Sequence, residues 1–174
     1  MSDLRNPGDA WVVADDGVRY WGKFGSAGLL AFDPNRGILL QHRVSWSDHG
    51  GTWGIPGGAR HEGEDAVTGA LRESHEEAGV PIDAIEPLYT YVIDRGGWTY
   101  TTVVAHVSRS FEPEITDAES HALAWVPLEE VETYELHPGF GSSWPKLWPL
   151  LGTGTDSVEA AERMLAEGVI ATID

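Results

Sequence analysis

Three glutamates spaced for one face of a helix are the residues best placed to do chemistry in this sequence. Glu73, Glu76 and Glu77 stand at positions i, i+3 and i+4 of a Pro-free stretch from 64 to 78. At 100° per residue their side chains share an arc of roughly 100°. The segment is therefore predicted to be a helix with these carboxylates beside a buried flank, which carries Ala66, Val67, Ala70, Leu71 and Ala78.

These acids occupy positions where they would destabilise an isolated helix. Like charges at this spacing repel by about a few tenths of a kcal/mol per pair. Negative charge near a helix C-terminus is also opposed by the macrodipole. A divalent cation reverses the preference, because Mg²⁺ takes oxygen ligands and is usually held by one or two carboxylates plus substrate phosphates. The alternative is a solvated acidic face, which would be the better interpretation of Glu76 and Glu77 alone.

The flanking residues extend the cluster into a longer pattern. Seven fixed positions at a frequency of about 0.1 each would recur by chance in roughly one such chain in 10⁵, which favours a functional origin. The pattern resembles the signature of the Nudix hydrolase family, matched here by Gly58, Glu64, Arg72, Glu73, Glu76, Glu77, Gly79 and Val80. Residues 51–58 resemble the family's Trp-x-Leu-Pro-Gly-Gly lead-in, with Ile55 for Leu. Ser74 replaces the usual aliphatic residue, and we expect its hydroxyl to bond back to the carbonyl of Ala70.

The resemblance implies a set of roles around bound Mg²⁺ or Mn²⁺. Glu76 and Glu77 would be the main metal ligands, together with a backbone carbonyl near Gly58. Glu73 would bind a metal or orient the attacking water, and which glutamate acts as the base varies in the family. Two further residues would serve the site indirectly: Arg72 would hold the carboxylates and loop in place, and Glu64 would be an outer ligand or structural partner.

Many family members add an acid from a loop on the far side of the cleft. Asp117 and Glu119 are the candidates here, and Glu119 is preferred as the further metal ligand. A glutamate that is common in the family is replaced by Ala122, and the alternative for Glu119 is a solvated loop acid.

Substrate-binding candidates are an arginine and three aromatic residues. Arg43 ends a predicted strand, where related proteins often place a phosphate-binding arginine; the alternative is a surface arginine. Trp46, Tyr91 and Trp98 have rings that could stack on a nucleobase. The chain has eight tryptophans, however, so core packing is the competing explanation for each ring.

The elements predicted around these residues describe an α/β (α+β) fold: a Nudix-type α/β/α sandwich with a mixed central sheet and a catalytic loop–helix–loop. Asp15-Asp16-Gly17 between two β-favouring runs predicts an N-terminal hairpin. Further strands are predicted at 27–32, 37–44, 86–94, 99–107 and 122–126, with a helical turn at 127–131 and helical character at 140–150. We expect a Nudix domain over residues 1–151, followed by a linker and helix over 152–174 packed on or beside it. Asp156 and Glu159 suggest a capping box for that helix, which is predicted to end at Gly168.

Composition excludes several classes of function. The formal charge of −17 leaves too few cations for the basic face that a nucleic acid polymer requires. Without cysteine there is no disulfide, thiolate catalysis or Cys-based zinc site. No run of about 18 apolar residues predicts a membrane span, and no secretory signal is recognisable, so we expect a cytoplasmic protein.

The resemblance implies Mg²⁺-dependent hydrolysis of a phosphoanhydride bond in a nucleoside diphosphate derivative, with a (deoxy)nucleoside triphosphate as the favoured substrate. The alternatives are a non-catalytic nucleotide-sensing module on the same fold, or an acidic Ca²⁺-buffering protein. The expected partner is a small nucleotide, and a homodimer is possible. Markers for ADP-ribose or dinucleoside polyphosphates are missing or out of register, so the sequence does not select a substrate.

Overall fold

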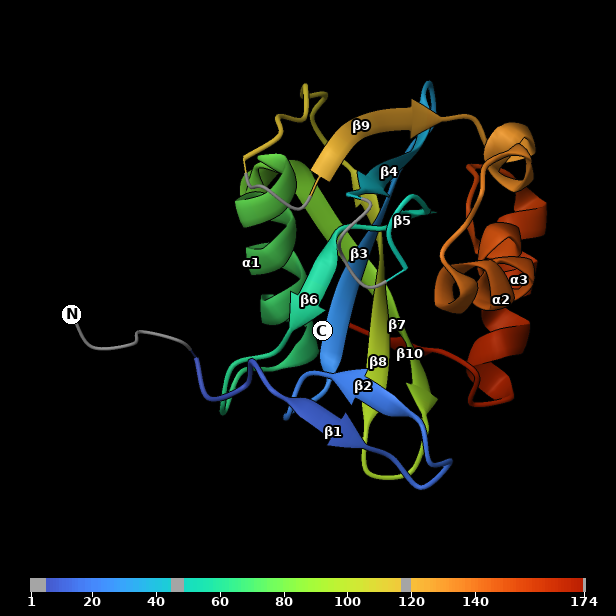
Figure 1. Ribbon diagram of the computed structural model, residues 1–174. Coiled ribbons are helices and arrows are strands. Elements are labelled where there is room, and N and C mark those ends of the chain that lie inside the picture. Colours follow the sequence, from blue (N-terminus) through green and yellow to red (C-terminus); the bar gives the residue numbers. More distant parts are fainter. Residues whose placement is uncertain (1–5, 45–48, 117–119, 174) are drawn as a thin grey trace.

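A computed structural model describes residues 6–44, 49–116 and 120–173. These residues form two sheets and three α-helices (Figure 1). The strands are β1 (Trp11–Val13), β2 (Arg19–Trp21), β3 (Ser26–Asp33), β4 (Gly37–Arg43), β5 (Trp53–Gly54), β6 (Gly57–Ala59), β7 (Ile85–Asp94), β8 (Thr99–Val107), β9 (Ser120–Val126) and β10 (Ala171–Thr172). The helices are α1 (Ala66–Ala78), α2 (Pro138–Leu147) and α3 (Thr155–Ala166), with 3₁₀ turns at Ile82–Ala84, Leu128–Thr133 and Trp148–Leu150.

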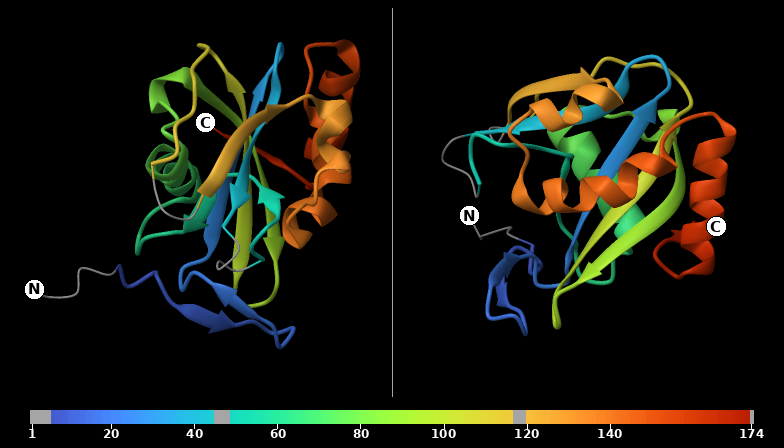
Figure 2. Two further views of the ribbon diagram at one scale, coloured as in Figure 1. Left: turned by 45° about the horizontal axis from the view of Figure 1, so that its top comes forward. Right: turned by 90° about the vertical axis from the view of Figure 1, so that its right-hand side faces the viewer.

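The larger sheet is mixed and is covered on both faces. Its order is β10-β7-β8-β3-β4-β5, with β6 paired to β3 and β9 paired to β4. β3 and β8 run parallel, whereas the other pairs are antiparallel. Helix α1 lies on one face, and α2 and α3 lie on the other (Figures 1 and 2). The predicted α/β/α sandwich with a mixed sheet is therefore confirmed.

Two apolar cores explain why the central strand β3 is buried along its whole length. Side chains alternate across a strand, so neighbouring residues enter opposite layers. Leu29 packs with the buried alanines of α1, whereas Leu30 packs with Trp144 of α2 and Met164 of α3. A continuous apolar run is the pattern expected of a strand buried on both faces.

Helix α1 has well-defined signals at both ends. Asp65 caps the N-terminus, where its carboxylate accepts from the amide of Thr68 at 2.8 Å, so the helix begins two residues later than predicted. Gly79 ends it in the left-handed conformation, at φ 64°. The hydroxyl of Ser74 donates to the carbonyl of Leu71 at 3.0 Å, so the expected bond to Ala70 is wrong. The hydroxyl still has a hydrogen-bond partner within the helix, so this polar side chain can be buried without an unsatisfied donor.

The predicted N-terminal hairpin forms and docks on the β7–β8 turn. β1 and β2 pair antiparallel, with Trp11 opposite Trp21. The amide of Asp15 donates to the carbonyl of Gly96 at 2.7 Å. The hairpin makes its own two-stranded sheet beside the larger one (Figure 1).

The C-terminal segment differs from its prediction in detail. Gly154 is the N-cap of α3 and offers no side-chain bond, so the capping box from Asp156 and Glu159 is wrong. Asp156 instead lies in the first turn, where its charge complements the macrodipole. The helix ends at Ala166, and after Gly168 the chain adds β10 to β7, a strand too short for a sequence pattern. None of the helices in the described residues has the length and apolarity to cross a membrane.

Candidate active site

Arg72 joins the loop before α1 to the carboxylates on the helix. Its Nε donates to Glu64 Oε2 at 2.8 Å, and its Nη2 donates to Glu64 Oε1 at 3.0 Å and to the carbonyl of Ala59 at 3.0 Å. The remaining nitrogen, Nη1, lies 3.0 Å from Glu73 Oε1 and 3.2 Å from Glu76 Oε2. A planar guanidinium suits this role because its donors are fixed in a fork that matches carboxylates. Arg72 therefore sets the position of three acids at once.

The three helix acids differ sharply in burial. Glu77 is 6% exposed, and its Oε2 accepts from the amide of Gly57 at 3.2 Å. The side chain of Glu73 is 16% exposed, whereas that of Glu76 is 56% exposed. Two carboxylates are thus held between α1 and β6, and the third lies at the solvent edge of the same cluster.

Two glycines make room for these carboxylates. A Cβ at Gly58 would lie 2.7–2.9 Å from the carboxyl atoms of Glu73, closer than any side chain allows. A Cβ at Gly69, inside α1, would approach Glu64 Oε1 to 3.0 Å. A side chain at either position would therefore force the neighbouring carboxylate to move from the place it holds here. This accounts for a glycine in the helix interior despite its cost of about 1 kcal/mol.

The carboxylates experience opposite electrostatic environments. Burial raises the pKa of Glu73, and this effect outweighs the attraction of the Arg72 guanidinium, while repulsion from Glu76 adds to it. Arg72 lowers the pKa of Glu64 through its hydrogen bonds, and the amide of His61 assists. The pKa of Arg72 itself is raised, chiefly by Glu64, so it remains a cation. Glu64 and Arg72 thus stabilise each other's charged forms, whereas burial disfavours the charged form of Glu73.

Oxygen donors of this kind fit a hard divalent cation. Among the residues that the structure describes, no three His, Asp or Glu side chains converge closely enough to hold a metal ion by themselves. Mg²⁺ does not require such a cage, because it keeps several waters and shares its coordination with substrate phosphates. The backbone of Gly58 lies beside the carboxylate of Glu73. A metal ion bound by one backbone oxygen and one carboxylate oxygen would need this arrangement.

The Glu64–Arg72 pair should make stability depend on pH in the acid range. The pKa of Glu64 in the folded state lies below the ordinary value of a glutamate in an unfolded chain. Its contribution is therefore fully present above that value and is lost as pH falls through the lowered pKa. We expect Glu64→Gln to destabilise the protein at pH 7 and to show a shrinking difference from wild type as pH falls below the unfolded pKa. Urea unfolding across this range measures it, and a pH-independent difference would contradict the assignment.

Three of the predicted substrate-binding residues lie in the described structure: Trp98 in the β7–β8 turn, Tyr91 on β7 and Arg43 on β4. Trp98 stacks on Tyr20 with ring centroids 4.2 Å apart, and its Nε1 donates to the carbonyl of Trp21 at 3.2 Å. It therefore fastens the hairpin, and one face of its ring is already covered. Tyr91 packs against the core on the α2 and α3 side of the sheet. Arg43 is partly buried at the end of β4, next to a register shift. Three candidates, Trp46, Asp117 and Glu119, lie outside the described residues.

Tyr100 is a neighbour of the site that sequence reasoning did not select. A Cβ at Gly28 would overlap the Tyr100 hydroxyl, so this group lies directly over the backbone of β3, beside Ile55. Burial raises the pKa of Tyr100, Glu77 raises it further, and Arg43 opposes the effect. The hydroxyl is therefore within electrostatic reach of both a predicted metal ligand and a predicted phosphate ligand. Only the parallel pairing of β3 and β8 brings these residues together.

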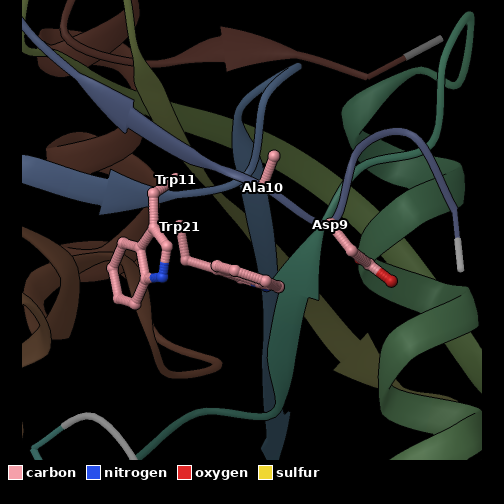
Figure 3. Close-up of a pocket in the computed structure, with 4 residues that line it drawn as sticks. All are labelled: Asp9, Ala10, Trp11 and Trp21. Atoms are coloured by element: carbon pink, nitrogen blue, oxygen red, sulfur yellow. The ribbon is translucent and has the colours of Figure 1, made fainter.

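A hollow in the surface lies away from this chemistry. It has a volume of about 620 Å³ and is lined by Asp9, Ala10, Trp11 and Trp21 at the base of the hairpin (Figure 3). It is open and shallow, and it contains none of the α1 acids. We therefore locate the candidate active site by the carboxylate cluster and not by cavity size.

Comparisons with known proteins agree with the geometry. The chain matches the family model for the NUDIX domain over residues 22–147. A Mycobacterium tuberculosis protein named "Putative 8-oxo-dGTP diphosphatase 3" is 46% identical over 154 residues, which is 83% of this chain and 70% of that protein. A Bifidobacterium longum nucleoside triphosphate pyrophosphatase/Nudix hydrolase fusion protein is 41% identical over 154 residues, 84% of this chain and 32% of that protein.

A solved structure supports the same assignment. The crystal structure of RenU, a Nudix hydrolase from M. smegmatis, is 42% identical, covers 80% of this chain and 92% of its own, and superposes with a TM-score of 0.71. The family model begins directly after β2 and covers β3 to β9, α1 and α2. The acid cluster, the fold around it and these relatives together show that the chain belongs to the Nudix family and is a Nudix hydrolase.

Proposed function

We propose that this hydrolase cuts a phosphoanhydride bond of a (deoxy)nucleoside triphosphate with Mg²⁺ or Mn²⁺ bound at the α1 acids. The observation that carries the proposal is the burial of the Glu73 and Glu77 carboxylates against Gly57 and Gly58, where a cation would offset their charge. One relative supports the substrate class, because its name describes an 8-oxo-dGTP diphosphatase.

Residues at different positions in the site would have different roles in the reaction. Glu76 and Glu77 would be the main ligands of the cation, together with a backbone oxygen of β6, and Glu73 would bind the cation from its buried side or orient the attacking water. When bound, the metal lowers the pKa of water and shields the phosphate charge. Arg72 would keep the acids in place through its bonds to Glu64, Glu73 and Ala59. A carboxylate within hydrogen-bond reach of the attacking water would accept its proton.

A bound cation would also offset the repulsion between this acidic protein and an anionic substrate. At −17, the chain repels a nucleoside triphosphate at long range. A cation at the acids would reverse the local field where the phosphates must bind. Oxidised purine triphosphates, canonical triphosphates and other diphosphate derivatives share this phosphate chemistry, so the base moiety is the variable to test.

The proposal is tested by a panel of nucleotides assayed for product identity. The panel contains canonical dNTPs, 8-oxo-dGTP, ADP-ribose and a dinucleoside polyphosphate, each with Mg²⁺, Mn²⁺ or EDTA. We expect metal-dependent release of a nucleoside monophosphate and pyrophosphate, fastest with a triphosphate. Turnover no higher than that of Glu76→Gln would contradict it. A nucleotide that raises the melting temperature without forming product would favour the sensing module instead.

A further inference from the structure

The last turn of α1 is closed by a segment from elsewhere in the chain. The amide of Glu114 donates to the carbonyl of Ala78 at 2.8 Å, and the amide of Thr116 donates to the carbonyl of Glu77 at 3.3 Å. The hydroxyl of Thr116 donates to the carbonyl of Glu76, forty residues away in the sequence. Thr116 therefore bonds to the backbone of both glutamates that the signature assigns as main metal ligands.

The two residues that directly follow α1 supply amide donors for only two carbonyls at the end of the helix. A helix leaves its last four carbonyls without intrahelical partners. The amides of Gly79 and Val80 satisfy the carbonyls of His75 and Ser74. The three carbonyls that follow are served by Glu114 and Thr116. Without the donors of Glu114 and Thr116, the carbonyls of the turn that carries Glu76 and Glu77 would have no hydrogen-bond partner from the chain, and the turn would fray.

The donors also act on the charge of the site. Open carbonyls give a helix C-terminus a partial negative charge, which destabilises carboxylates nearby. Two N–H groups and one O–H group directed at these carbonyls offset part of that charge. The segment thus reduces the electrostatic repulsion between the helix C-terminus and the acids of the last turn. The same hydrogen bonds also fix the backbone of that turn.

The segment is itself anchored to the sheet. Arg36, in the β3–β4 turn, donates to the carbonyl of Phe111 and to Glu112 Oε1, each at 2.6 Å. The guanidinium of Arg36 lies 4.4 Å from the ring centroid of Trp125 on β9. Close packing adds to this, because a Cβ at Gly79 would be 3.4 Å from Glu114. Residues 111–116 therefore connect the end of α1 to the rigid centre of the fold.

We propose that Thr116 is a positioning residue for the metal-binding acids, whose hydroxyl holds the last turn of α1 so that Glu76 and Glu77 are preset for a divalent cation. The inference rests on the proposed function, because it assigns the cation to these acids. It adds a residue outside the signature to the machinery of the site.

The test compares Mn²⁺ binding, followed by electron paramagnetic resonance without substrate, in matched variants. Thr116→Val keeps the shape and the amide but removes the hydroxyl, and it is expected to weaken Mn²⁺ binding roughly three- to tenfold, as loss of one hydrogen bond allows. Thr116→Ser keeps the hydroxyl and should remain within about twofold of wild type. Thr133→Val is the control, because it removes an equivalent hydroxyl bond to the carbonyl of Glu130, remote in sequence from α1.

Turnover separates positioning from general stability. The Mg²⁺ concentration for half-maximal rate should rise in Thr116→Val by the same factor as the Mn²⁺ dissociation constant, while kcat at saturating Mg²⁺ changes little. Unchanged Mn²⁺ binding in Thr116→Val, or an equal loss in Thr116→Ser or Thr133→Val, would overturn the inference. Thr116→Ala replaces Thr116→Val if the latter does not fold. Wild-type protein that binds Mn²⁺ but hydrolyses no nucleotide would overturn the proposed function alone, and the binding comparison would still decide the role of Thr116.

Discussion

Glu77→Gln is expected to lower kcat by on the order of 10³-fold on the best nucleotide of the panel at saturating Mg²⁺, a loss of about 4 kcal/mol in transition-state stabilisation. Glu77 is the most buried of the helix acids, and its carboxylate already accepts from Gly57. The amide keeps the shape and one acceptor but removes the charge that a cation needs. Steady-state kinetics with purified, metal-reconstituted protein measures the loss.

Two controls separate this effect from misfolding. Glu62→Gln makes the same change in charge at an exposed position before α1 and should leave kcat unchanged. The melting temperature of metal-free Glu77→Gln should not fall below that of wild type, because the change removes like-charge repulsion with Glu73, four residues earlier on the helix. If Glu77→Gln retained a tenth of the wild-type rate or more, its place as a main metal ligand would have to be abandoned.

Arg72→Ala is expected to cost about 3 kcal/mol in free energy of unfolding, the lower end of the range for breaking a buried ion pair. The change leaves the side chains of Glu64, 10% exposed, and Glu73, 16% exposed, without their shared cation. It also removes the bond to the carbonyl of Ala59 that fastens the loop to the helix. Arg72→Lys should recover only part of the loss, because an ammonium cannot reproduce the two-pronged contact with Glu64. Urea unfolding in EDTA measures both variants.

A double-mutant cycle assigns the cost to the pair. Arg72→Ala combined with Glu64→Ala should be less destabilising than the sum of the single changes, by about 0.5–3 kcal/mol. Arg163→Ala, at an exposed position in the last turn of α3, is the control and should change stability by no more than about 0.5 kcal/mol. Additive effects in the cycle would show that Arg72 acts through other contacts.

The α1 segment shows how far the sequence alone could lead. Its acids, its apolar flank and its end at Gly79 all follow from a 3.6-residue period and from terminal signals that act over a few residues. The N-terminal hairpin was predictable for the same reason, because Asp-Gly between β-favouring runs is a local turn signal. Where two local signals competed, prediction failed: the Asp156 capping pattern gave way to Gly154 as the N-cap of α3.

The sequence by itself determined which residues form the acid cluster and which helix carries them, because both depend on spacing along the chain. The tertiary structure decided which acid is buried, since the exposure of Glu77 and Glu76 depends on where β6 lies against α1. It also decided that Tyr20 covers Trp98 and that Thr116 closes the last turn of α1. These contacts join residues far apart in sequence, and no local periodicity specifies which strands and loops become neighbours in a mixed sheet.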